Sequence, residues 1–218
     1  AYADNGDGNG FLYTNEIPVP QLVGCDRKVK TRIVTLGDSV TQGCQTSEFG
    51  YQFWAAKLLD QLGTEDYSLW NLGIGHARAS DCARQGNWLN RAVAGADLIT
   101  VAFGTNDIIS GPYGGTGHAT PEEIEADVRK ITRTCTDAGI RTILWNSPSF
   151  DMTPELDGIR TVYNETVEGI AKDNGATYFD VASLLADPSD ASKTVYGQHP
   201  NDEGGTVITD ALVKLIQE

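Results

Sequence analysis

Residues 31–40 read TRIVTLGDSV, in which a β-branched run stops at a glycine and a polar turn follows. Four more short apolar runs follow along the chain, and a helical pattern stands between each run and the next. The five runs predict strands over residues 31–36, 67–72, 98–103, 141–145 and 176–179. Strands that alternate with helices through right-handed crossovers predict a parallel sheet covered on both faces. We therefore expect an α/β chain, folded as a three-layer α/β/α sandwich around a parallel five-stranded sheet.

The clearest helix start is at Thr120, which can cap a helix whose first residue is Pro121 and whose capping box includes Glu123. Gly139 is expected to end this helix. Weaker patterns predict helices over residues 51–62, 80–93 and 202–216. The helix expected over residues 154–173 shows one apolar side, formed by Ile159, Val162, Thr166 and Ile170.

The chain has 218 residues, with 30 acidic and 16 basic side chains and a formal net charge of −14. Nucleic acids and anionic membrane surfaces are recognised largely through Lys and Arg, so this charge argues against both as partners. Apolar runs stay well short of the ~18 residues of a membrane-spanning helix. Residues 1–30 are polar and rich in Gly, Pro and Asn, and we interpret them as an N-terminal arm packed on one domain, residues 31–218. We expect the protein to act as a monomer.

The four cysteines are well separated, and no two have the Cys-x-x-Cys spacing of zinc or thioredoxin-like sites. An even number in an acidic chain predicts two disulfides in a secreted protein, with reduced cysteines in a cytosolic domain as the alternative. The first residues, AYADNGDGNG, lack a signal-peptide pattern, as a cleaved secreted chain also would. Residues 5–16 have the oxygen spacing of a calcium loop, but too few residues precede them for a flanking helix. We expect a solvated arm there, no metal and no cofactor.

Polar turns follow the strands, and the carboxyl ends of parallel strands meet at one edge of the sheet. Ser39 stands where the first strand passes into a helix, so its hydroxyl is expected to face solvent. A serine is a poor nucleophile until a base takes its proton, and the chain has three histidines, His76, His118 and His199. We take His199 as the base, because it lies on an edge loop and is followed by a proline.

Donors for an oxyanion are also expected at this edge. Asn106, after the third strand, can donate its side-chain amide. The backbone N–H groups of Ser39 and of the Gly75–His76 turn can supply further donors, each typically worth ~3–4 kcal/mol in the transition state. A nucleophile, a base and oxyanion donors together predict acyl transfer.

At this point the sequence resembles the SGNH, or GDSL, hydrolase family from residue 31 to the last helix. The motifs are Leu36-Gly37-Asp38-Ser39-Val40-Thr41, Gly104-Thr105-Asn106-Asp107 and His199-Pro200-Asn201-Asp202-Glu203-Gly204. The resemblance implies Ser39 as nucleophile, Asn106 as an oxyanion donor and His199 as base. It also implies a flavodoxin-like sandwich with strand order 2-1-3-4-5, which agrees with the alternation of strands and helices.

The chain departs from the family pattern in its second motif. The family has an asparagine, four residues and then a glycine whose backbone N–H points into the oxyanion hole. Counting from Asn71 places His76 at that glycine, with Gly75 just before it. Because the role belongs to a backbone N–H, Gly75 and His76 both remain candidates.

A second departure concerns the acid of the family's triad. The expected Asp three residues before the histidine is replaced by Tyr196. We expect a Ser39–His199 dyad in which the backbone carbonyl of Tyr196 accepts the Nδ1 proton. A carboxylate from elsewhere, Asp190 or Asp202, is one alternative, and a weakened or inactive enzyme is another.

The expected fold also suggests how the cysteines pair. Cys44 and Cys82 follow turns at the catalytic edge, whereas Cys25 and Cys135 lie at the opposite edge. Pairing like with like predicts bridges Cys44–Cys82 and Cys25–Cys135, one of the three connectivities that four cysteines allow.

These features predict a secreted serine esterase that cleaves a small-molecule ester or a carbohydrate ester through an acyl-enzyme. The acidic surface and few extra loops favour a small acyl group such as acetate, and Trp88 is a candidate wall of the substrate site. One alternative is a lipase or lysophospholipase on longer chains, and another is a non-catalytic binding module. A flavin-binding protein is disfavoured, because Asp38 stands where a phosphate would sit.

Overall fold

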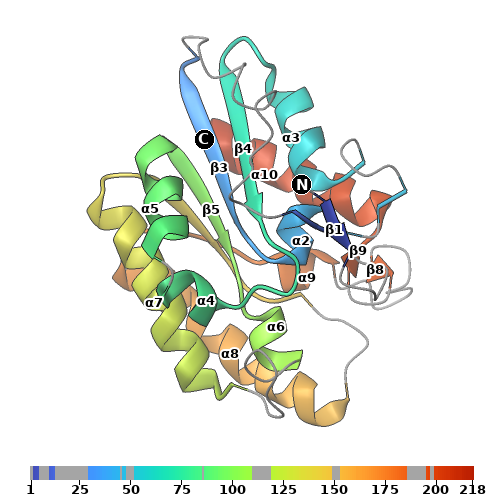
Figure 1. The fold of residues 1–218 in the computed structure, drawn as a ribbon, viewed down its shortest axis with the longest axis vertical. Coiled ribbons are helices and arrows are strands. Elements are labelled where there is room, and N and C mark those ends of the chain that lie inside the picture. The colour runs from blue at the N-terminus through green and yellow to red at the C-terminus, as the bar shows by residue number, and fades with distance from the viewer. Residues whose placement is uncertain are drawn as a thin grey trace.

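The computed structural model describes residues 2–4, 10–12, 29–44, 46–47, 52–84, 86–109, 119–148, 153–185, 195–196 and 199–218. At its centre is a five-stranded parallel sheet in the order β4-β3-β5-β6-β7, which is the order 2-1-3-4-5 along the chain (Figure 1). The strands are β3 (Thr31–Gly37), β4 (Tyr67–Gly73), β5 (Leu98–Ala102), β6 (Arg141–Trp145) and β7 (Thr177–Phe179). The predicted fold class, strand order and strand positions are confirmed.

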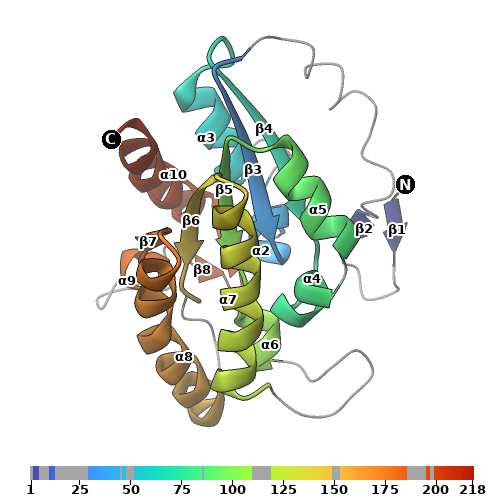
Figure 2. The ribbon, with the colours of Figure 1, turned by 90° about the vertical axis from the view of Figure 1, so that its left-hand side faces the viewer.

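Helices cover both faces of the sheet (Figure 2). One face packs against α4 (Ala79–Arg84), α5 (Gly86–Gly95), α7 (Pro121–Asp137) and α8 (Pro154–Asp173). The other packs against α3 (Trp54–Leu62), α9 (Val181–Leu185) and α10 (Asp202–Gln217). Neighbouring strand residues point to opposite faces, so Val34 joins the first apolar core and Ile33 the second. The two cores together form the three-layer sandwich.

Short elements lie at the carboxyl edge of the sheet. They are α2 (Ser39–Gln42) after β3, α6 (Thr105–Ile109) after β5, and the antiparallel pair β8 (Val195–Tyr196) and β9 (His199–Pro200). In the N-terminal arm, β1 (Tyr2–Asp4) pairs with β2 (Gly10–Leu12), which the sequence did not predict. Most of the calcium-like stretch lies outside the described residues. Of the helices described, none combines the length and the apolar character needed to cross a bilayer.

The helix predictions hold in part. The capping box at Thr120 is confirmed, with Thr120 and Glu123 each accepting the other's backbone N–H. The single helix over residues 80–93 is wrong, because α4 ends at Arg84 and α5 begins at Gly86. Glycine costs roughly 0.5–1 kcal/mol in a helix interior and is better tolerated at a terminus.

The apolar side expected for α8 is confirmed at Ile159 and Ile170 and is wrong at Val162. Val162 is 48% exposed, whereas Tyr163, Val167 and Ile170 are fully buried. The buried stripe is therefore turned by about one position, because Tyr163 rather than Val162 enters the core. This turn directs α8 toward the loop that follows β5.

The predicted disulfides are wrong. Cys44, Cys82 and Cys135 are free thiols, which excludes both the Cys44–Cys82 and the Cys25–Cys135 bridge, and Cys25 itself lies outside the described residues. Cys82 and Cys135 lie in the same apolar core, on the contacting helices α4 and α7. Cys44 instead lies just after α2, with its Sγ 3.5 Å from Oε1 of Gln42. Burial raises the pKa of the Cys135 thiol to about 12, so these thiols are packed as apolar groups.

Candidate active site

The turn after β3 holds Ser39 rigidly at the sheet edge. Asp38 caps α2, because its Oδ1 accepts a 2.9 Å hydrogen bond from the backbone N–H of Val40. The carbonyl of Val40 accepts a 3.0 Å bond from Nε1 of Trp54 in α3. Ser39 itself is 8% exposed. Ser39 is therefore held in position and is almost completely buried.

Two glycines allow this turn to pack closely against the sheet. A Cβ on Gly37 would lie 2.6 Å from the carbonyl oxygen of Ala102, and a Cβ on Gly73 would lie 2.3 Å from the backbone nitrogen of Gln42. At Gly73 the nearest atoms are all backbone, which cannot move aside as a flexible side chain can, and at Gly37 the Thr41 side chain obstructs a Cβ as well. The backbone of α2 therefore rests directly on β4.

Asn71 ties the same two elements together. Its Nδ2 donates to the carbonyl of Thr41 at 2.8 Å, and its Oδ1 accepts from the N–H of Gly73 at 2.9 Å. The hydroxyl of Thr35, on β3, donates to the same Oδ1 at 3.1 Å. Sequence reasoning used Asn71 only to count residues, and its role as a link between the nucleophile turn and the oxyanion turn was missed.

His199 meets Ser39 from the other end of the chain. Its Nε2 lies 2.7 Å from Oγ of Ser39. β9 carries the histidine, and α10 starts shortly afterwards with Asn201 as its N-cap, which accepts from the N–H of Gly204 at 2.9 Å. The residues predicted as nucleophile and base are thus within hydrogen-bond distance.

The imidazole of His199 is neutral at physiological pH. Burial, with a further contribution from the neighbouring His76, lowers the pKa of His199 to about 4. A neutral ring with its proton on Nδ1 presents a lone pair on Nε2 toward the serine hydroxyl. His199 is therefore in the protonation state that a general base needs.

No described residue hydrogen-bonds to Nδ1 of His199, although that atom is buried. The backbone of Tyr196 lies directly opposite His199 in the β8–β9 pair. The carboxylate of Asp202 instead accepts two hydrogen bonds from Ser47, one from the backbone N–H at 2.9 Å and one from the hydroxyl. Asp190 lies outside the described residues. The carbonyl of Tyr196, the acceptor expected from the sequence, makes no such bond here, and its role in orienting His199 stays a prediction.

Asn106 lies in α6, next to the turn that follows β4. Its Nδ2 donates to the carbonyl of Ala77 at 3.0 Å, which joins the two turns that carry the oxyanion donors. This bond uses one of the two hydrogens on the carboxamide nitrogen. Asn106 is 9% exposed.

The structure distinguishes Gly75 from His76 by backbone conformation. Residues 74–77 form a turn in which the N–H of Ala77 donates to the carbonyl of Ile74 at 3.1 Å. His76 has φ +60°, the left-handed conformation, and is alone in this among the described non-glycine residues. Gly75 does not have a positive φ. His76 thus adopts the conformation that favours glycine, as expected at the family's glycine position, and its side chain is exposed.

Two buried carboxyl groups lie behind the site. Burial, with a further contribution from the nearby Asp107, raises the pKa of Asp38 to about 7. Burial likewise raises the pKa of Asp107 to about 6, although its Oδ2 accepts a 3.0 Å bond from the N–H of Ala79. Both groups therefore carry a proton more readily than an exposed aspartate does.

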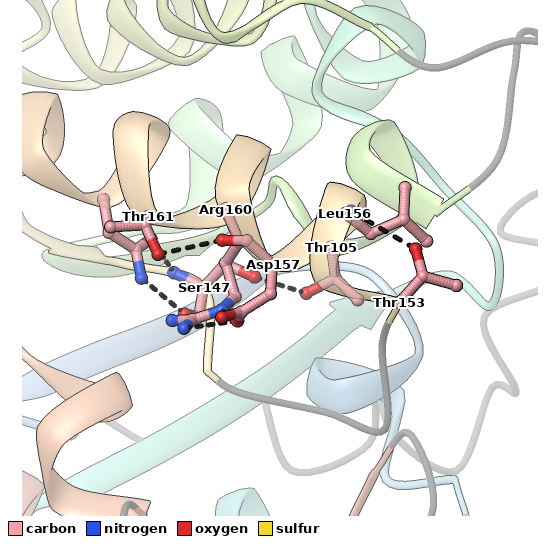
Figure 3. Close-up of polar contacts among 8 residues, drawn as sticks. Thr105, Ser147, Thr153, Leu156, Asp157, Arg160 and Thr161 are labelled. Carbon is pink, nitrogen blue, oxygen red and sulfur yellow. Dashed lines mark hydrogen bonds and ion pairs between the residues drawn. The ribbon is translucent and has the colours of Figure 1, made fainter.

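The loop after β5 is also supported from α8, which the sequence analysis missed. Figure 3 shows Ser147 beside Thr105, with their hydroxyl oxygens 3.1 Å apart. On α8, Arg160 and Asp157 form an ion pair, with Nη2 and Oδ1 2.7 Å apart. The only sequence signal was the position of Ser147, directly after the fourth strand.

Other predicted or possible site features fall elsewhere. Trp88 is 6% exposed, bonds through Nε1 to the carbonyl of Leu72 at 3.2 Å and packs edge-on against Phe103, so it belongs to the core and does not form a substrate wall. His118 lies outside the described residues. Within the described ranges, His, Cys, Asp and Glu side chains form no group of three or more that could hold a metal.

The chain matches one family model, described as the GDSL-like Lipase/Acylhydrolase family, over residues 35–207. No curated protein matches the chain significantly.

Several solved structures share the fold. An acetyl xylan esterase, AlAXEase, has 19% sequence identity and a TM-score of 0.69, covering 85% of this chain and 99% of its own. An aryl esterase from M. smegmatis also has 19% identity and a TM-score of 0.69, with 86% and 98% covered. An acetyl-xylooligosaccharide esterase from Geobacillus has the same identity and TM-score, with 87% and 95% covered. At these identities the likeness shows the fold.

Replacing Asp38 with Asn tests the buried carboxyl. Because its pKa is raised in the folded state, Asp38 contributes stability that is complete at low pH and is lost as the pH rises through about 7. Asn keeps the cap and carries no charge at any pH. Between pH 5 and pH 8, the unfolding free energy of Asp38→Asn should therefore rise relative to that of the wild type by on the order of 3 kcal/mol. Urea titrations at each pH measure this difference. Asp60→Asn, at an exposed position of α3, is the control, and equal pH dependence of both variants would contradict the burial argument.

Replacing Asp202 with Asn tests which group orients His199. Since the carboxylate of Asp202 binds Ser47, Asp202→Asn should leave kcat for p-nitrophenyl acetate within about tenfold of the wild type. Asp190→Asn should behave in the same way, whereas His199→Ala should remove nearly all activity. A loss of about 10⁴-fold in either aspartate variant would identify that residue as the missing acid.

Proposed function

The chain belongs to the GDSL-like lipase/acylhydrolase family, and from this premise we propose that it is a serine esterase that removes small acyl groups, acetyl above all, from carbohydrates or other small esters. The observation that supports this most directly is the 2.7 Å contact between Oγ of Ser39 and Nε2 of His199. An esterase needs a hydroxyl beside a neutral base, and the lowered pKa of His199 supplies the second condition.

In the proposed acylation step, Oγ of Ser39 attacks the ester carbonyl carbon while Nε2 of His199 takes the hydroxyl proton. The carbonyl oxygen becomes an oxyanion, which the N–H of Ser39, the N–H of His76 or Gly75, and the amide of Asn106 stabilise. The tetrahedral intermediate then collapses, and the bond from carbon to the alcohol oxygen breaks. His199 gives its proton to the departing alcohol, which leaves an acyl group on Ser39.

Deacylation repeats these steps with water in place of serine. His199 takes a proton from the water as its oxygen attacks the acyl carbon, and the same donors hold the second oxyanion. The bond to Oγ breaks, and the proton on Nε2 returns to Ser39. The products are a carboxylic acid and the free enzyme, so neither a metal nor a redox cofactor enters the balance.

The choice of a small acyl group rests on two features. The sandwich takes up nearly all of residues 31–218, so few residues remain for a lid over a long acyl chain. A net charge of −14 suits a neutral, soluble substrate better than an anionic lipid surface. Two of the similar structures act on acetylated xylan or xylooligosaccharides, which supports a carbohydrate acetyl ester as substrate. Action as a monomer, without nucleic acid or membrane partners, is part of the proposal, and an extracellular location remains a prediction.

The acyl-chain preference can be measured with p-nitrophenyl esters. We expect kcat/KM to be highest for the acetate, at least about tenfold lower for the octanoate and lower still for the palmitate. The reason is that the proposed site for small acyl groups leaves no room for a long acyl chain. Ser39→Ala should be inactive toward all three. A preference for octanoate or palmitate would favour the lipase alternative.

The same proteins should be treated with a fluorophosphonate probe. The probe should label the wild type on Ser39 and should not label Ser39→Ala. An unlabelled wild type would contradict the esterase proposal and favour a binding module on this fold.

The pH dependence of kcat/KM reports the ionisation of the base in the free enzyme. Since burial lowers the pKa of His199 to about 4, activity should rise with pH through about 4 and be nearly constant by pH 6. His76→Gln removes the charge that helps to lower the pKa of His199, so the pH at which activity is half-maximal should rise. Samples held at each acid pH and assayed at pH 7 control for unfolding, and a wild-type midpoint at 6.5 or above would refute the assignment.

A further inference from the structure

We propose that Asn164, on α8, is a positioning residue that holds the oxyanion donor Asn106 in place through Ser147 and Thr105. This inference rests on the proposed esterase function. It concerns a residue outside the three motifs that carry the family resemblance.

The first step is a reciprocal pair between Asn164 and the backbone of Ser147. The N–H of Ser147 donates to Oδ1 of Asn164 at 2.9 Å, and Nδ2 of Asn164 donates to the carbonyl of Ser147 at 2.8 Å. A carboxamide used in this way replaces the backbone partner that a further strand would supply. It therefore fixes the chain immediately after β6, where regular pairing ends at Trp145.

The second step leads from Ser147 to α6. Ser147 is 1% exposed, and its hydroxyl oxygen lies 3.1 Å from that of Thr105, the first residue of α6 (Figure 3). Asn106 is the next residue. Fixing Ser147 thus fixes the start of the short helix that carries the oxyanion donor.

Tyr163, next to Asn164 on α8, supports the same loop independently. Its hydroxyl donates to the carbonyl of Phe103 at 3.1 Å, and the residue is fully buried. Gly104 has φ +124°, and a Cβ there would lie 2.5 Å from the Tyr163 ring. Residues 103 and 104 are therefore in direct contact with α8, and Thr105 is linked to it through Ser147.

This support matters because α6 has only five residues and cannot hold its own position. On one side, the amide of Asn106 bonds to the carbonyl of Ala77. On the other side, Tyr163 of α8 contacts residues 103 and 104, and Ser147 contacts Thr105. The placement of the amide relative to Ser39 is thus determined by packing against two separate elements.

A displaced oxyanion donor affects the transition state more than the bound ester, because full negative charge forms on the oxygen only in the transition state. Loss of Asn164 should therefore lower kcat and leave KM nearly unchanged. A residue that merely stabilised α8 would lower the melting temperature without this split.

The chain offers a matched control in Asn174, the C-cap of the same helix. Asn174 is also half-buried, and its Nδ2 donates to the carbonyl of Ile170 at 2.7 Å. It lies just before β7 begins, at the edge of the sheet opposite the site. Asn174→Ala thus removes a hydrogen-bonded carboxamide from α8 and leaves the loop 103–105 untouched.

The experiment compares Asn164→Ala, Asn164→Asp and Asn174→Ala with the wild type, using p-nitrophenyl acetate and melting temperatures. We expect kcat of Asn164→Ala to fall about tenfold or more, with KM within about twofold. Asn164→Asp keeps the acceptor for the N–H of Ser147 and loses the donor, so its kcat should lie between those of the wild type and Asn164→Ala. Asn174→Ala should melt earlier and keep kcat within about twofold.

Inhibition by a trifluoromethyl ketone gives a second readout. Its adduct with Ser39 carries an oxyanion, so Ki should rise in Asn164→Ala by the same factor by which kcat/KM falls. Ser147→Ala removes only the hydroxyl contact to Thr105 and keeps the backbone pair, which provides a milder variant if Asn164→Ala does not fold. The double variant Ser147→Ala/Asn164→Ala should lose less than the product of the two single losses, because both act through one chain of contacts.

Two results would overturn the inference while leaving the esterase proposal intact. One is an active wild type in which Asn164→Ala and Asn174→Ala have the same kcat. The other is a loss confined to KM, with an unchanged Ki for the ketone. An inactive, unlabelled wild type would instead contradict the proposed function itself.

Discussion

The site depends on the close approach of α2 to β4. At Gly73 the strand carries no side chain, so the backbone of Gln42 can lie where a Cβ would otherwise be. Asn71 then bonds both elements at once, to Thr41 on α2 and to Gly73 on β4. Through this contact, the position of Ser39 determines where the turn at residues 74–77 lies. The nucleophile and the first oxyanion donors are therefore one rigid unit.

Around this unit, burial removes charge. It raises the pKa values of Asp38 and Asp107 and lowers that of His199, so each group favours its neutral form. In such a surrounding, the oxyanion and the imidazolium of His199 are the charges that form during the proposed reaction. Electrostatic donors act most strongly in such a setting, because little water screens them.

Local signals predicted the parts of the fold and site that depend on neighbouring residues. The capping box at Thr120 and the strand that ends at Gly37 are examples, and the order of the motifs led to the contact between Ser39 and His199. Where distant packing decides the outcome, prediction failed. The cysteine pairing depended on which helices meet, and the buried side of α8 depended on Tyr163 reaching the carbonyl of Phe103. The role of Asn164 depends on a backbone partner at Ser147, which no spacing in the sequence indicates.

Tyr196 stands where the family has its acid, and this makes the support of the oxyanion donors from α8 more important. Burial and the neighbouring His76 lower the pKa of His199, which limits how strongly it can draw the proton from Ser39. Such a site must obtain more of its transition-state stabilisation from the oxyanion donors. Donors provide it only when they are held in place before the charge forms, since reorientation during the reaction costs free energy. A short helix such as α6 meets that requirement through its contacts with neighbouring elements, among them Ser147, which α8 holds, and the turn at Ala77.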